Sequence, residues 1–149
     1  MPRSREFPAG ALVALPIDGE RFAVGQILIP GIKFYIGIDP EGRSSMGESH
    51  PLNLRLFAWT TDGEIYRKSW KLIGQRPLPE QFPRPDYKFE QAGETFVETF
   101  DGSVIRPFDP ATDQHVRYRW SVSPALLSDA VLSFNGKAAW MPHFDKFLA

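Results

Sequence analysis

The residues that could bind a metal ion are few and lie far apart in the sequence. The three histidines are His50, His115 and His143, and the chain of 149 residues contains no cysteine. Only His143 has an acidic residue close to it, Asp145. A protein metal site needs three or four ligands, usually with some of them at short spacings. We therefore predict that the chain binds no metal ion and no other cofactor.

Residues for nucleophilic catalysis are equally sparse. There is no thiol, and no serine lies in the Gly-x-Ser-x-Gly sequence that forms a nucleophile elbow. Ser121 and Ser123 lie near His115, but the first belongs to a strand pattern and the second precedes a predicted helix. No glycine-rich loop leads from a strand into a helix, as a phosphate site would require. These patterns predict a protein that is not an enzyme.

Two patterns leave other functions open. Glu94 and Glu98 share one face of a predicted strand, and two carboxylates brought together in space could support hydrolysis. Tyr118 lies between Arg117 and Arg119, residue types that stack on bases and contact phosphates. Alternation along a strand places both arginines on the face opposite the tyrosine. A small barrel that binds a ligand or single-stranded nucleic acid is the alternative function, and a hydrolase is the third.

An Asp-Gly turn between two apolar runs occurs three times, at residues 18–19, 62–63 and 101–102. Glycine adopts positive φ freely and aspartate tolerates it, so this pair closes tight hairpins. Three such hairpins in one chain predict an antiparallel meander. The strands should occupy the segments that alternate or are continuously apolar, at residues 11–15, 22–29, 33–38, 54–59 and 116–122.

Two segments depart from the strand pattern. Residues 75–86 contain four prolines, which donate no ladder hydrogen bond, so this segment should cross the surface as an extended linker. A helix should begin after the N-cap Ser123 and stop at Asn135-Gly136. Its buried stripe should consist of Leu127, Val131 and Phe134.

The sequence therefore predicts a mostly β (β-rich α+β) fold. We expect a strongly bent antiparallel sheet or a partly open barrel, with a short C-terminal helix packed on it. At 149 residues the chain fits a single domain. Its expected parts are an N-terminal tail at 1–9, a β-rich body at 10–122, and a helix with a packing tail at 123–149.

The composition limits the class of protein and the partners. Hydrophobic residues make up 42% of the chain and charged residues 23%, which is typical of a globular protein. No stretch approaches the roughly 18 apolar residues of a membrane helix, and residues 1–9 are too polar for a signal peptide. The net charge of −1 gives no general attraction for nucleic acid. We predict a soluble cytoplasmic protein with no membrane partner.

The segment from Ser69 to Phe89 has an unusual order of residues. Its distinctive residues are Trp70, Ile73-Gly74, Pro77-Leu78-Pro79, Phe82, Pro85 and Phe89. Together with residues 10–16 and 22–28, this segment resembles the immunity protein 26 family, predicted immunity proteins of bacterial polymorphic-toxin systems. The resemblance covers residues 10–90 well and the remainder weakly. It implies a non-enzymatic protein that neutralises a cognate toxin by direct binding, and we interpret the matching residues as determinants of the fold.

Two acidic segments are candidates for contact with such a toxin. Toxins that attack nucleic acids often have basic active sites, to which an acidic surface is complementary. The first candidate surrounds the third Asp-Gly turn and comprises Glu90, Glu94, Glu98 and Asp101. The second is the loop at residues 39–51, which is long, polar and without an evident role in folding. Its acidic residues are Asp39, Glu41 and Glu48.

Overall fold

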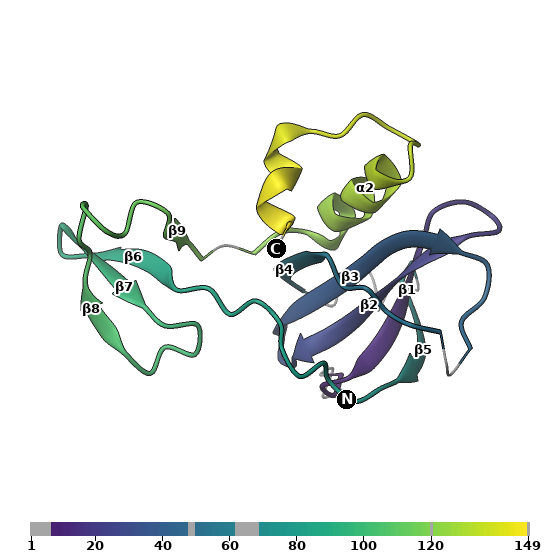
Figure 1. The fold of residues 1–149 in the computed structure, drawn as a ribbon, viewed down its shortest axis with the longest axis horizontal. Helices are drawn as coiled ribbons and strands as arrows, with labels where there is room; N and C mark the ends of the chain where they lie inside the picture. The colour runs from purple at the N-terminus through teal and green to yellow at the C-terminus, as the bar shows by residue number, and fades with distance from the viewer. Residues whose placement is uncertain (1–6, 48–49, 62–68, 120, 149) are drawn as a thin grey trace, which may run out of the picture. The chain divides into compact units, whose positions relative to one another are not determined.

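The chain forms two compact units (Figure 1). Unit 1 comprises Met1–Pro79 and Ser121–Ala149, and unit 2 comprises the segment between them, Glu80–Trp120. The prediction that residues 1–149 form a single domain stays a prediction. This computed structural model describes residues 7–47, 50–61, 69–119 and 121–148.

Unit 1 is built on a five-stranded sheet with the order β4-β3-β2-β1-β5. Every neighbouring pair in it is antiparallel, as the hairpin signals predict. The continuously apolar strands lie in the middle of the sheet, where both faces are covered. The strands are β1 (Ala11–Pro16), β2 (Phe22–Ile29), β3 (Lys33–Arg43), β4 (Leu56–Thr61) and β5 (Lys71–Gln75).

Glycine is required at position 25, in the middle of β2. A Cβ atom there would lie 2.7 Å from Cδ1 of Ile36 in β3 and 3.3 Å from Cγ2 of Val13 in β1. Both neighbours are fully buried, so a side chain at position 25 would force the end of Ile36 to shift within the core. The missing side chain lets the neighbouring strands fill this part of the core.

The next residue, Gln26, connects segments that are distant in the sequence. Its buried side-chain amide donates hydrogen bonds to the carbonyl oxygens of Arg76 (3.1 Å) and Pro77 (3.2 Å) and lies 3.5 Å from that of Gly10. These carbonyls belong to the start of β1 and to the chain after β5. Gln26 therefore connects the start of β1 to the chain that follows β5.

The first predicted turn connects β1 to β2. The carboxylate of Asp18 accepts hydrogen bonds from the backbone N–H groups of Glu20 (2.9 Å) and Arg21 (2.8 Å). These bonds lower the pKa of Asp18 from 3.8 to about 2. The predicted turn at residues 62–63 lies outside the described residues.

The predicted helix is present as α2 (Pro124–Phe134). Ser123 caps it by accepting a hydrogen bond from the N–H of Leu126 (3.2 Å), and the helix ends at Asn135. Leu127 and Val131 are fully buried against the sheet, as predicted. The prediction was wrong for Phe134, which is 38% exposed. It lies in the last turn, and its ring stacks under the guanidinium of Arg55 at 5.0 Å.

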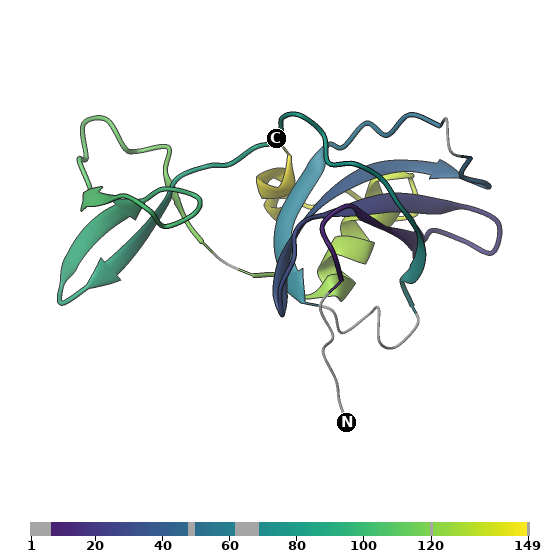
Figure 2. The same ribbon diagram turned by 90° about the horizontal axis from the view of Figure 1, so that it is seen from below.

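The core of unit 1 lies between α2 and one face of the five-stranded sheet (Figures 1 and 2). Trp70 is its largest side chain and is 1% exposed, which agrees with its interpretation as a fold determinant. The indole Nε1 donates to Oγ of Ser128 in α2 (2.8 Å), so the buried polar group is satisfied.

The C-terminal segment covers one edge of this sheet. Leu148 forms an antiparallel bridge with Leu56 of β4, and Ser121 forms a parallel bridge with Trp59 of the same strand. The 3-10 helix η1 (Pro142–Phe147) contributes two buried phenylalanines to the core. The chain therefore protects the β4 edge with its own residues.

Unit 2 contains a four-stranded sheet with the order β8-β7-β6-β9. The β6–β7 hairpin turns at Ala92 and Gly93, whose φ angles are 52° and 80°. Two positive values are typical of the tight turns that suit a hairpin, although this pair lacks the Asp-Gly signature. The strands are β6 (Tyr87–Gln91), β7 (Glu94–Glu98), β8 (Ile105–Pro107) and β9 (Arg117–Tyr118).

Two segments around unit 2 test the sequence predictions. Among the described residues of the predicted strand at 116–122, Arg117 and Tyr118 form β9, which runs parallel to β6 and pairs with Tyr87 and Lys88. Residues 76–86 contain no helix or strand, as their prolines predict, and they lead from unit 1 into unit 2.

The prediction of a mostly β fold with a short C-terminal helix is confirmed (Figure 2). Both sheets have two ends and neither closes into a barrel. Among the residues that the structure describes, no helix has the length and apolar character needed to cross a membrane.

Candidate functional site

The third Asp-Gly turn of the chain lies on unit 2 and is held by the carboxylate of Asp101. Asp101 accepts hydrogen bonds from the backbone N–H of Ser103 (3.0 Å), from its hydroxyl (2.7 Å) and from the hydroxyl of Thr99 (2.9 Å). These bonds lower the pKa of Asp101 from 3.8 to about 2. The turn connects β7 to β8, as predicted, and its carboxylate is engaged with the turn itself.

The β6–β7 hairpin divides the predicted acidic residues between two faces. Directly opposed residues share a face, and the register pairs Phe89 with Phe96 and Glu90 with Thr95. Glu94 and Glu98 therefore lie on the same face as Phe96, which agrees with the sequence prediction. Glu90 lies on the opposite face, so the four acids do not form one cluster.

Glu94 and Glu98 flank an aromatic pair. The rings of Phe89 and Phe96 stack with their centroids 5.6 Å apart, and both side chains are half-buried. On the neighbouring strand β8, Ile105 is paired in register with Glu98 and is 58% exposed. Within the described part of the chain, neither glutamate side chain forms a hydrogen bond or an ion pair. We call the surface formed by Phe89, Glu94, Phe96 and Glu98 the acidic face; the register also places Arg117, which is paired with Tyr87, on this face.

On the opposite face of this sheet, the charged and polar side chains contact one another. The hydroxyl of Tyr118 donates a 2.5 Å hydrogen bond to Glu90, which raises the pKa of Tyr118 above its ordinary value. The ammonium of Lys88 lies 4.7 Å from the centre of the Tyr118 ring. Glu90, Tyr118 and Lys88 therefore form one connected group on this face.

An internal ion pair holds the chain between β8 and β9. Asp113, which is 3% exposed, accepts hydrogen bonds from both terminal nitrogens of Arg106 (2.6 and 2.8 Å) and from the N–H of Asp109 (2.8 Å). These bonds lower the pKa of Asp113 from 3.8 to about 2. Sequence reasoning gave this residue no role, because its partner becomes a neighbour only through the strand pairing.

The arrangement of Tyr118, Arg117 and Arg119 bears on the alternative of a ligand-binding groove. Arg119 donates to the carbonyl of Phe100 (2.7 Å), and its guanidinium lies 4.6 Å from the ring centre of Tyr87. Tyr118 is 46% exposed, but its ring lies on the face opposite the arginines, where Lys88 packs over it. The tyrosine and the arginines thus do not converge.

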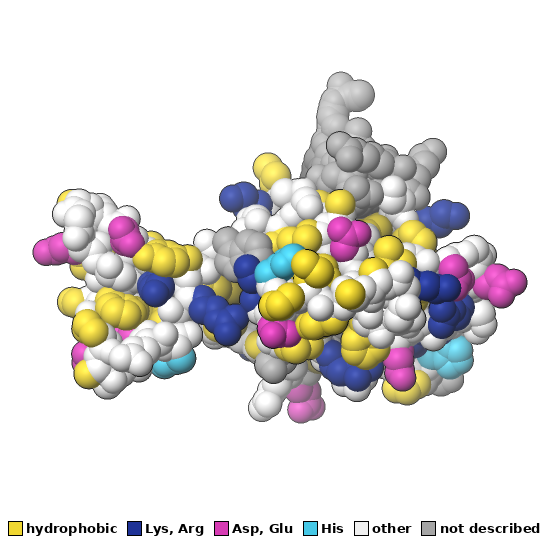
Figure 3. Space-filling view, turned by 90° about the horizontal axis from the view of Figure 1, so that it is seen from above, with side chains coloured by type: hydrophobic (Ala, Val, Ile, Leu, Met, Phe, Trp, Pro, Cys, Tyr) yellow, Lys and Arg dark blue, Asp and Glu magenta, His cyan; other side chains and the backbone are white. Residues whose placement is uncertain are grey.

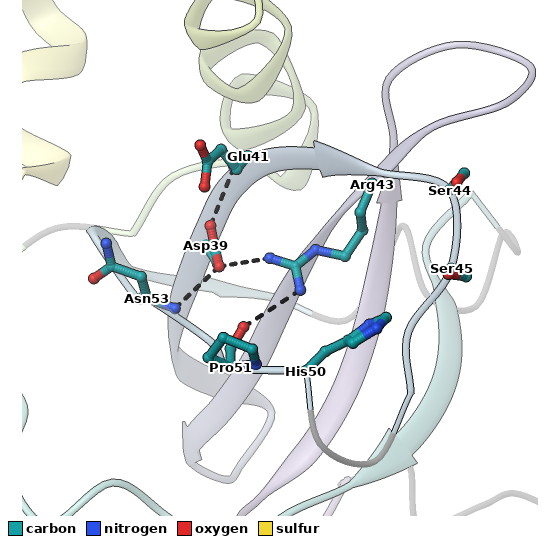
Figure 4. Close-up of a pocket in the computed structure, with 8 residues that line it drawn as sticks. All are labelled: Asp39, Glu41, Arg43, Ser44, Ser45, His50, Pro51 and Asn53. Atoms are coloured by element: carbon teal, nitrogen blue, oxygen red, sulfur yellow. Dashed lines mark hydrogen bonds and ion pairs between the residues drawn. The ribbon is translucent and has the colours of Figure 1, made fainter.

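The predicted loop at 39–51 lines an open pocket of about 470 Å³ in unit 1 (Figure 4). Glu41 is exposed and lies 3.7 Å from Arg55, while Glu48 lies outside the described residues. The pocket is lined by Asp39, Glu41, Arg43, Ser44, Ser45, His50, Pro51 and Asn53.

The prediction that this loop has no folding role is wrong, because Asp39 organises it. The Asp39 side chain is 2% exposed and pairs with Arg43 at 2.6 Å. It also accepts hydrogen bonds from the N–H groups of Glu41 (3.2 Å) and Asn53 (3.0 Å) (Figure 4). Asp39 belongs to β3, so these bonds anchor the loop to the sheet. Because Asp39 itself is buried, it would affect a partner surface by fixing the position of the loop.

Several polar residues considered for metal binding or catalysis have structural contacts. His50 accepts a hydrogen bond from the N–H of Gly47 (2.9 Å), and His143 packs edge-on against Phe144. Ser123 caps α2 and Ser121 bridges to β4. Over the described ranges, no three histidine or acidic residues gather in a way that could hold a metal ion.

Figure 3 shows acidic, basic and hydrophobic side chains next to one another on the visible face of unit 2. Sequence reasoning identified the acids of this unit but not the phenylalanines between them. The alternation from Tyr87 to Gln91 could have indicated that Phe89 and Phe96 share a face, had the Ala92-Gly93 turn been recognised.

No family model, curated protein or solved structure matches this chain.

Proposed function

We propose that this protein neutralises a bacterial toxin by binding it directly, with the acidic face of unit 2 as the contact surface. The toxin would present a basic surface, such as the nucleic-acid-binding site of a nuclease. This function is also the one implied by the resemblance of residues 10–90 to the immunity protein 26 family.

The observation that carries the proposal is the difference in charge pairing between the two faces of the unit 2 sheet. On one face, Lys88, Glu90 and Tyr118 satisfy one another. On the acidic face, which also carries Arg117, the carboxylates of Glu94 and Glu98 have no hydrogen-bonding or ionic partner among the described residues. Unpaired charges contribute little to the stability of the fold, so their presence favours an external cation as the partner.

The aromatic pair adds a contact that charge alone would not give. Phe89 and Phe96 offer half-buried rings between the two carboxylates. The methylene chain of a lysine or arginine packs well on such rings, and its charged head can then reach a glutamate. Electrostatic attraction would accelerate encounter, and burial of the rings would slow dissociation.

The experiment begins with the product of the gene adjacent to the one encoding this chain. Its toxicity is measured on expression, followed by rescue through co-expression and by co-purification of the two proteins. Protection by the wild-type chain with recovery of a stable complex is expected. A neighbour that is not toxic, or a toxic one that the chain does not bind, would remove the main support for the proposal.

Charge reversal then tests the contact surface. The double variant Glu94→Lys/Glu98→Lys should lower the association rate at low ionic strength by about tenfold or more, because steering would become repulsion. The difference should shrink in high salt. The matched control is Glu20→Lys/Glu80→Lys, which makes the same charge change at exposed positions off the acidic face. Equal rates for both double variants would exclude the acidic face as the contact.

A further inference from the structure

The side chain of Asn135 joins the end of α2 to the end of β3. Its Nδ2 donates hydrogen bonds to the carbonyl oxygens of Pro40 (2.7 Å) and Val131 (2.8 Å), and its Oδ1 accepts one from the N–H of Gly42 (3.2 Å). The approach to β3 is close, because a Cβ atom at Gly42 would lie 3.2 Å from Oδ1. The amide therefore uses both its donating and its accepting groups to hold the helix on the strand.

The residue that follows makes this amide chemically reactive. Gly136 is exposed and has a φ of 76°. Because glycine has no Cβ, nothing shields its backbone nitrogen from the side chain before it, and asparagine is a thermolabile residue. The chain contains one other asparagine, Asn53, which precedes the bulky Leu54. Asn135 is therefore the asparagine of this chain that is poised for reaction with its own backbone.

We propose that Asn135 is a site of spontaneous deamidation and that its product releases α2 from β3. The backbone nitrogen of Gly136 attacks Cγ of Asn135 and forms a succinimide. The bond from Cγ to Nδ2 breaks, and Nδ2 leaves as ammonia with the proton of the Gly136 N–H. Water then opens the ring at one of its two carbonyl groups. The product is aspartate or isoaspartate, with one more negative charge than asparagine and no change of oxidation state.

The product cannot replace the hydrogen bonds of the amide. A carboxylate only accepts, but its oxygen would face the carbonyl oxygens of Pro40 and Val131, which Nδ2 now contacts. The new negative charge also lies at the C-terminal end of α2, where the helix dipole disfavours it. Glu41 and Arg43, which line the pocket of unit 1, flank Gly42 in the same stretch of β3. Deamidation therefore loosens the last turn of α2 and one wall of this pocket.

The folded structure slows the reaction that it makes consequential. The N–H of Gly136 donates to the carbonyl of Ser133 (3.1 Å), and the leaving group Nδ2 is held by two further bonds. Attack on Cγ requires these bonds to open. The last turn of a helix opens at a lower free energy than the core, so deamidation of the native chain should follow this local opening.

Peptide mapping by mass spectrometry tests the site. The full chain is incubated at mildly alkaline pH, in native buffer and in guanidinium chloride. Asn135 should deamidate in both, at least about tenfold more slowly in the native chain, because the last turn must open first. Asn53 is the matched control and should react much more slowly than Asn135 in guanidinium chloride. Equal rates for the two asparagines there, equal native and unfolded rates for Asn135, or an Asn135 that stays intact in the native chain over weeks would overturn the proposal.

Hydrogen exchange tests the consequence. The amides of Gly136 and Lys137 donate to carbonyls of the last turn of α2. In Asn135→Asp they should exchange at least about tenfold faster than in wild type, because the turn opens more often. Asn53→Asp makes the same chemical change at an exposed position and should leave both rates unchanged. Deamidated wild-type chain, separated by ion exchange, should match Asn135→Asp. Unchanged exchange in both the variant and the deamidated chain would contradict release of α2.

Discussion

The carboxylate of Asp113 holds the segment between β8 and β9 by contacting both Arg106 and the backbone of Asp109. Two bonds to one guanidinium fix the geometry more firmly than a single surface ion pair does. This segment precedes β9, which completes the sheet by pairing with β6. Asp113 is therefore the charged side chain with the largest expected role in the stability of unit 2.

We predict that Asp113→Asn destabilises unit 2 at neutral pH, because the charged bidentate pair is lost. The folded pKa of about 2 lies below the ordinary 3.8, so the wild-type contribution is present above about pH 4 and is lost as the pH falls towards 2. The stability difference between wild type and variant should therefore narrow over this range. Urea unfolding at pH 7, 4 and 2.5, followed by tryptophan and tyrosine fluorescence, would measure it.

The control for this prediction is Glu80→Gln, which neutralises an exposed carboxylate of unit 2. It should leave the stability within about 0.5 kcal/mol of wild type. If the difference in unfolding free energy between Asp113→Asn and wild type stayed constant from pH 7 to 2.5, the charged pair would not be responsible for it.

Residues with local partners could be predicted from the sequence, and residues with distant partners could not. Ser123 and Asp18 bond to groups two or three positions away, so their roles follow from short motifs. The partners of Gln26 and Asp39 include groups that only the folded chain brings close. The role of Asp39 was accordingly misjudged, and that of Gln26 was not foreseen.

Among the elements, α2 was located well because several independent signals agree. A capping serine, a proline at the first position and an Asn-Gly stop bracket the same segment. β9 was overestimated because alternation indicates which residues can share a face, but the length of a strand depends on its partner. The β6–β7 hairpin was missed because Ala92 adopts positive φ without the usual aspartate or asparagine.

We predict that Ser123→Ala destabilises unit 1 by about 1 kcal/mol, because the N–H of Leu126 loses its side-chain acceptor. Thermal or urea unfolding monitored by circular dichroism would measure the loss. Ser45→Ala, in an exposed loop, should change the stability by less than about 0.5 kcal/mol. Equal stability of both variants would contradict the assigned role of the cap.

At the scale of the whole molecule, the two units differ in how much apolar surface they bury. Unit 1 has many fully buried side chains in a single cluster around Trp70. Unit 2 has fewer buried hydrophobic residues, namely Phe82, Tyr87, Val97, Phe100 and Val116. A unit of roughly 40 residues with no cysteine to form a disulfide is at the lower limit of independent stability.

Hydrogen exchange should therefore distinguish the units. We predict that the amides of β6 and β7 exchange at least about tenfold faster than those of β2 and β3, because unit 2 opens at a lower free energy. Mass spectrometry of peptides from both units would measure the two rates. Equal protection of the two sets of strands would instead support the single cooperative domain that the sequence predicts.

The order of the two units along the chain has a further consequence. Unit 2 is one continuous segment nested within unit 1, entered after Pro79 and left before Ser121. Insertions, deletions and substitutions within it can accumulate without changing the strand order of the five-stranded sheet. If toxin recognition resides on the acidic face, as we propose, specificity can diverge within this segment while natural selection preserves the surrounding scaffold.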